Sequence, residues 1–233
     1  MTKSAFAMAV AALAATTLAG PAKADLVLQG PMNFQGTGLG AVNTVLTIQS
    51  PGSSSFESGS VGRVMGSSDD VINGDAKTGT SQTQTRSIGS LGISSASQLR
   101  VVFNATEPGN ALDQGIVLSD LQLNIYRSDG ALLFSSGLFT PVSFADTFNG
   151  VGNSGFVFAL NSAQAAQAQA AAFGAGSGSN LIGLSATAAG ATGGPETFFV
   201  AAAPIPEPDA YLLMAVGVVA LGFVAKRRGA PRR

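Results

Sequence analysis

Residues 121–127 (LQLNIYR) alternate strictly between apolar and polar side chains. A period of two is typical of a β-strand with one buried face. The turn-forming run RSDG follows at 127–130, with a glycine that can adopt a positive φ. The apolar run ALLFS at 131–135 then returns. This pattern predicts a β-hairpin over residues 121–136.

Other short apolar runs are separated by Gly, Ser, Asn and Pro, as in all-β domains with many turns. The runs predicted to be strands are 25–29, 44–49, 99–104, 155–160, 181–186 and 197–202. Their spacing indicates a mainly β fold, an antiparallel β-sandwich of roughly eight to ten strands.

Two segments depart from this pattern. Residues 162–173 (SAQAAQAQAAAF) consist of strong helix formers and predict one short inserted helix. Asn161 or Ser162 can cap its start, and Gly174 or Gly176 can end it. Residues 51–85 contain few apolar side chains, and we expect either a long loop or a pair of polar edge strands there.

The N-terminal 24 residues have the features of a secretory signal peptide. Lys3 supplies positive charge, residues 5–18 are apolar, and Ala22-Lys23-Ala24 forms an A-x-A cleavage site. An uncleaved membrane anchor is the alternative, but the apolar run is short for a membrane span. The sequence predicts a signal peptide over 1–24 and a mature chain that starts at Asp25.

The C-terminal segment predicts a membrane-spanning helix. Residues 210–225 contain no charge, and the tail at 226–233 is rich in basic side chains. The basic residues that would stop transfer are Lys226, Arg227, Arg228, Arg232 and Arg233. Positive charge stays on the cytoplasmic side, so the preceding chain is predicted to lie outside. The exported domain would then span residues 25–203.

A proline-rich stretch precedes the predicted span. Pro204, Pro206 and Pro208 restrict the backbone to extended conformations. The succession of Pro206-Glu207-Pro208, a short apolar segment and a basic end resembles the PEP-CTERM sorting signal of Gram-negative bacteria. The resemblance covers about residues 204–233, with the motif at 206–208, although Asp209 stands where Ala or Ser is common.

This resemblance implies several properties of the protein. It implies processing by an exosortase, a membrane-embedded protease and transpeptidase, and an association with bacteria that produce exopolysaccharide. The expected precursor is held in the inner membrane with its domain in the periplasm. The product is then expected at the cell surface or outside the cell.

The composition excludes several kinds of chemistry. The chain has no Cys, His or Trp, so disulfides, thiolate metal sites and Ser-His-Asp triads are excluded. The 12 Lys and Arg against 13 Asp and Glu argue against nucleic acid as a partner. With only Tyr126 and Tyr211, and Phe expected in the core, we expect no aromatic platform for sugars. No catalytic residue is predicted, and we expect the protein not to be an enzyme.

One acidic cluster is a candidate cation site. Asp69, Asp70, Asn73 and Asp75 bring oxygen ligands of the kind that suits Ca²⁺ into seven residues. The spacing does not match an EF-hand, and a polar turn with local hydrogen bonds is the favoured interpretation. No cofactor is therefore expected, with Ca²⁺ as the alternative.

Three functional hypotheses follow. The first is an exported surface or extracellular-matrix protein with a structural role, associated with biofilm or exopolysaccharide. The second is an adhesin or carbohydrate-binding β-sandwich, with calcium dependence as a variant of it. The third, which we do not favour, is a hydrolase, and it would need a pair of carboxylates that face a cleft.

Overall fold

The computed structural model of the protein describes residues 26–32, 43–51, 54–79, 81–105, 115–144, 155–191 and 194–203. These residues form a mainly β fold with antiparallel strands. The strands are β1 (Leu26–Met32), β2 (Thr44–Ile48), β3 (Phe56–Arg63), β4 (Asp70–Gly74), β5 (Arg86–Ser87), β6 (Leu99–Asn104), β7 (Ile116–Tyr126), β8 (Leu132–Ser135), β9 (Val142–Phe144), β10 (Gly155–Leu160), β11 (Leu181–Ala189) and β12 (Glu196–Ala202). The α-helix α1 (Ser162–Ala172) and short 3₁₀ helices at Gly89–Leu91, Ala96–Gln98 and Ser177–Ser179 complete the described elements.

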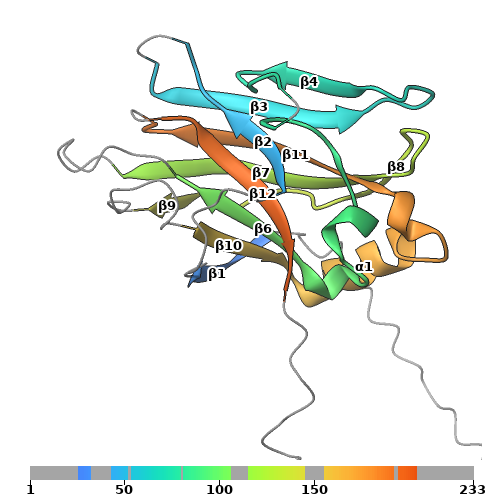
Figure 1. Cartoon of the computed structure of the whole chain (residues 1–233). Coiled ribbons are helices and arrows are strands. Elements are labelled where there is room, and N and C mark those ends of the chain that lie inside the picture. Colours follow the sequence, from blue (N-terminus) through green and yellow to red (C-terminus); the bar gives the residue numbers. More distant parts are fainter. Residues whose placement is uncertain are drawn as a thin grey trace, which may run out of the picture.

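The described strands form two sheets (Figure 1). The smaller sheet has the order β1-β10-β6-β12-β2. The larger sheet has the order β4-β3-β11-β7-β8, with β5 paired to β11 and β9 paired to β7. All of these pairings are antiparallel, and the arrangement is consistent with a β-sandwich.

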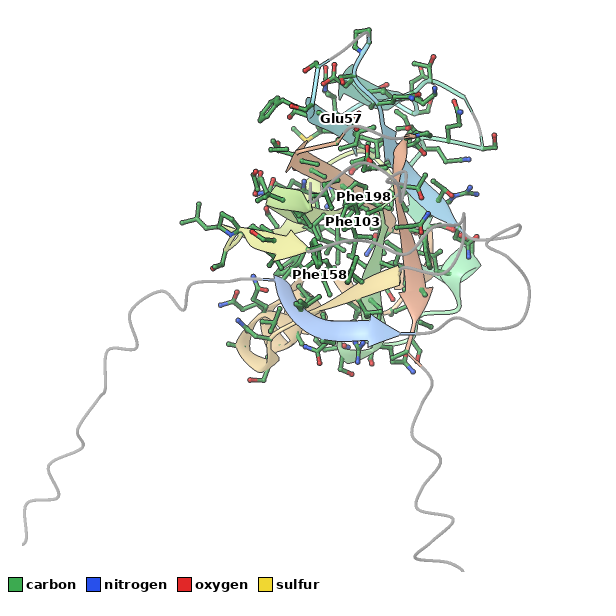
Figure 2. All side chains as sticks on the ribbon, turned by 90° about the vertical axis from the view of Figure 1, so that its left-hand side faces the viewer. Glu57, Phe103, Phe158 and Phe198 are labelled. Carbon is green, nitrogen blue, oxygen red and sulfur yellow. The ribbon has the colours of Figure 1, made fainter. Side chains whose placement is uncertain are left out.

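The core lies between the two sheets and is rich in phenylalanine. Phe103 of β6, Phe158 of β10 and Phe198 of β12 are all fully buried there (Figure 2). The rings of Phe103 and Phe198 stack with their centroids 4.9 Å apart. The larger sheet supplies aliphatic side chains from the inward positions of β7 and β11. Burial of these apolar faces is the main force that holds the sheets together.

The predicted hairpin is confirmed. Strands β7 and β8 pair across the turn, and the Gly130 N–H donates to the Arg127 carbonyl oxygen over 2.9 Å. Gly130 adopts a φ of 88°, as the turn requires. The six other predicted strands correspond to β1, β2, β6, β10, β11 and β12.

The inserted helix is also confirmed. The Asn161 side chain accepts a hydrogen bond from the Gln164 N–H and so caps the first turn of α1. The helix contacts β8, β10 and the 3₁₀ helix at Ala96–Gln98. Gln164 lies buried on its inner side and donates to the Ser136 carbonyl oxygen.

The expectation for residues 51–85 needs correction. A long loop is wrong for this segment, because β3 and β4 form a paired hairpin within it. The alternative of two polar strands is right, but only β4 lies at the edge of the sheet. Strand β3 pairs with β11 on its other side and belongs to the sheet interior.

The predicted signal peptide, sorting motif and membrane span lie outside the described residues. Within the described ranges, we find no helix with the length and apolar composition that a membrane crossing requires.

Candidate functional site

The outer face of the larger sheet is polar because three of its central strands alternate in phase. On β7, Leu121, Leu123 and Ile125 point into the core, so Gln122 and Asn124 point outward. On β3, the outward residues Ser58, Ser60 and Gly62 are small or polar, and so are the outward residues Gly183, Ser185 and Thr187 of β11. The polar halves of several amphipathic strands therefore lie side by side.

The strand register arranges these outward residues in rows that cross the sheet. Asn73 of β4 pairs with Ser60 of β3, Ser60 with Ser185 of β11, and Ser185 with Gln122 of β7. A neighbouring row runs from Ser58 through Thr187 to Asp120. The hydroxyls of Ser58 and Thr187 lie 3.0 Å apart and hydrogen-bond to each other. The rows place polar groups from four strands on one surface.

This surface is hollowed. One hollow of about 340 Å³ and a second of about 220 Å³ share Ser60, Asn73 and Ser185 in their walls. We call the combined depression the polar groove. Its volume is within the range of small-molecule sites, roughly 300–1,000 Å³.

An aromatic ring lies across one end of the polar groove. A Cβ on Gly62 would stand 2.6 Å from the Tyr126 hydroxyl, and a Cβ on Gly183 would stand 3.1 Å from the Tyr126 Cε2. The ring therefore reaches from β7 over β11 to β3, and the two glycines leave the space for it. The half-buried Tyr126 lines the groove. The sequence led us to expect no aromatic platform for sugars, and Tyr126 is the one aromatic residue in the described lining of this groove.

Burial raises the pKa of the Tyr126 phenol above its usual value, and the backbone hydrogen bond with Arg63 opposes this effect. The phenol is therefore neutral at physiological pH. At the other end of the groove, burial raises the pKa of Asp120, against the effect of a backbone hydrogen bond from Leu121. Among the described lining residues, Arg63 is the one cation, and its guanidinium pairs with Asp70 at 2.9 Å. The groove therefore carries little net charge.

The side chains of the acidic cluster at 69–75 have different partners. The Asp70 carboxylate pairs with Arg63 and accepts hydrogen bonds from the Thr85 hydroxyl and N–H. The Asp75 carboxylate accepts from the Ser58 N–H over 3.0 Å. Asn73 points into the polar groove, and Asp69 is exposed. No metal-ligating group of three or more acidic side chains occurs among the described residues. The calcium alternative stays a prediction.

Two buried carboxyl groups lie at one end of the core. Glu57 is 4% exposed, and its Oε1 accepts from the Ser50 N–H over 3.1 Å (Figure 2). Glu196 is fully buried and pairs with Ile48 of β2, two residues from Ser50. Neither residue lines the polar groove, where Asp120 is the one carboxylate of the described lining. A second carboxylate, which glycoside hydrolysis would need, does not occur among the described lining residues.

The other predicted site residues lie outside the described part of the chain. They are Ala22 and Ala24 of the cleavage site, Pro206, Glu207 and Pro208 of the sorting motif, and Lys226, Arg227, Arg228, Arg232 and Arg233 of the basic tail. Their assignments stay predictions.

No protein-family model, curated protein or solved structure matches this chain. The serines and glycines of this surface gave no signal of a site in the sequence, because such residues are ordinary in β-proteins. One signal was available, since the polar positions 122 and 124 of the hairpin strand precede Tyr126 at the same period of two.

Proposed function

We propose that the protein is an exported surface or extracellular-matrix protein, sorted through a C-terminal signal of the PEP-CTERM type. The observation that carries this proposal is the ordered tail of Pro206-Glu207-Pro208, an uncharged segment at 210–225 and a basic end. The predicted signal peptide at 1–24 supports it independently, because it would send the same domain across the membrane.

The extent of the folded domain is compatible with this proposal. Strand β1 begins at Leu26, one residue after the predicted mature start. Strand β12 ends at Ala202, and the Ala203 N–H donates to the Gln98 carbonyl oxygen over 2.6 Å. The described strands thus lie between the two predicted signals.

In this proposal the protein has no catalytic role. The inner membrane holds the precursor, an exosortase processes it, and exopolysaccharide surrounds the product. Nucleic acid is not a partner in this scheme, because the described outer face of the larger sheet offers no cluster of cations for phosphates.

The test is the mass of the protein recovered from the cell surface of a native host. Wild-type protein should lack residues 226–233, whereas Glu207→Ala should leave an uncleaved precursor in the inner membrane. Asp209→Ala is the matched control, because it removes a neighbouring carboxylate outside the motif and should be processed normally. Surface protein that still carries its basic tail would favour a simple tail anchor.

A second candidate function is a carbohydrate-binding or adhesin module. The specific observation that favours it is the polar groove with Tyr126 at one end. Carbohydrate binding would also account for retention of an exported protein in a polysaccharide layer.

A further inference from the structure

The central row of the polar groove has unused hydrogen-bonding capacity. The side chains of Asn73, Ser60 and Ser185 make no hydrogen bond within the described residues, and they share the hollowed floor. Gln122 continues the row and has one long contact, 3.5 Å from the Asn124 amide. Hydroxyl and amide groups both donate and accept. Such a row matches a ligand that itself carries many hydroxyl groups.

Tyr126 adds an apolar surface beside this row. Its ring lies across two strands, on glycines that carry no side chain to lift it. An aromatic body with a polar tip suits ligands with one apolar face and polar edges. Pyranose rings have this character, because their C–H groups gather on a face and their hydroxyls project from the rim.

The charges in the groove favour an uncharged ligand over an acidic one. Arg63, the cation among the described lining residues, is held by Asp70, and Asp120 is the carboxylate on the floor. A phosphorylated or strongly acidic polymer would find no free cation there. An uncharged ligand does not need a cation in the groove.

The floor is large enough to accept a short stretch of a polymer chain. Four adjacent strands, β4, β3, β11 and β7, contribute to it. Three interstrand spacings of about 4.8 Å give a width of roughly 14 Å. The outward positions from Gly62 to Ser58 extend four residues along β3, which is again roughly 14 Å.

We propose that the polar groove binds a neutral polysaccharide, with Tyr126 as the stacking platform and Asn73, Ser60, Ser185 and Gln122 as the hydrogen-bonding floor. This inference rests on the proposal that the protein acts outside the cell. The groove belongs to the folded domain, however, so its binding is measured independently of sorting.

The first experiment uses tyrosine fluorescence. The chain has two tyrosines and no tryptophan, so in the full-length Tyr211→Phe variant Tyr126 is the single strong fluorophore. Dextran, mannan and galactan serve as neutral probes, and alginate serves as the acidic probe. We expect at least one neutral polymer to change the Tyr126 emission saturably and alginate to leave it unchanged.

The second experiment uses affinity electrophoresis of full-length variants in gels that contain the active polymer. Tyr126→Ala should weaken binding roughly tenfold or more, as truncation of a central aromatic anchor does. Tyr126→Phe keeps the ring and should retain most of the affinity. Ser185→Val should obstruct the floor and weaken binding by a similar factor. Ser143→Val is the matched control, since it makes the same change at an exposed position of β9 outside the groove lining.

Three results would overturn the inference. They are no response to any neutral polymer, tighter binding of alginate than of the neutral polymers, and equal affinity of Ser185→Val and Ser143→Val. Failure of the sorting proposal would look different, because the surface protein would keep its tail while binding in the gel stayed intact.

Discussion

Gly183 has no side chain, and both the packing of the larger sheet and the position of the Tyr126 ring in the polar groove require this. It occupies β11, between β3 and β7, at the point that the Tyr126 ring crosses. In Gly183→Ala the new Cβ would overlap the Val61 carbonyl oxygen and stand 3.2 Å from the Gly62 Cα. Both neighbours belong to the backbone of a paired strand and cannot move alone.

The size of the effect follows from two opposing contributions. Forcing an extra methyl group into a packed site costs about 1–3 kcal/mol. Replacing Gly by Ala restricts the unfolded chain and returns roughly 0.4–1 kcal/mol. The two ranges leave a net loss of about 0–2.6 kcal/mol, and because the new Cβ meets backbone atoms we expect Gly183→Ala to lower the free energy of unfolding by about 1–2 kcal/mol. For a domain of this size the melting temperature should fall by roughly 2–8 °C.

Thermal unfolding followed by far-UV circular dichroism would measure this loss. Gly174→Ala is the matched control, because nothing lies within 4 Å of its Cβ position, and it should be at least as stable as the wild type. Gly62→Ala should cost less than Gly183→Ala, because its Cβ meets the end of the Tyr126 side chain rather than backbone. A melting temperature of Gly183→Ala equal to that of Gly174→Ala would refute this account of the groove floor.

Two further predictions concern the core and the pH dependence of stability. Phe103→Ala removes a fully buried ring and should cost about 3–5 kcal/mol, whereas Phe56→Ala, at a side chain 55% exposed, should change the stability much less. Equal denaturation midpoints for the two variants would contradict the assigned core. The pKa of Asp120 is raised in the folded protein. Its contribution to stability is therefore fully present below the pKa of the unfolded chain, near 3.8, and is lost as the pH rises through the pKa of the folded protein. Asp120→Asn should therefore be slightly more stable than the wild type at neutral pH, with the difference vanishing near pH 3. A difference that stays constant between these pH values would contradict the raised pKa of Asp120.

The hairpin strand shows why part of the fold was predictable. The inward positions of β7 from Leu121 onward follow a strict period of two, and the strand was found from that point. Its first half was missed, because Leu118 and Leu121 are three residues apart and both are buried. The register shift between Thr187 and Ala188 of β11 accommodates this change of phase with a β-bulge. A bulge cannot be distinguished from the end of a strand by alternation alone.

Strand β3 shows a different limit. Its inward positions include Glu57 and Gly59, so its core face has no continuous apolar pattern. Gly59 is small because the Ile48 side chain of β2 fills its place, with Cγ2 2.7 Å from where a Cβ would be. The apolar group that completes this part of the core thus comes from a residue eleven positions earlier in the chain. A small residue in one sheet whose space is filled by a side chain of the other sheet can be recognised only once the strands are assembled.

The polar groove could not be predicted from the sequence for a related reason. A core is encoded by side chains that avoid water, and each strand carries that signal by itself. The groove is encoded by small residues on separate strands, Gly62 and Gly183, whose common role is to let Tyr126 lie down across them. In the sequence, each of these glycines looks like any other glycine of a β-protein. Only the register that brings β3, β11 and β7 together places both glycines under the Tyr126 ring, so such an arrangement can be recognised only in the assembled sheet.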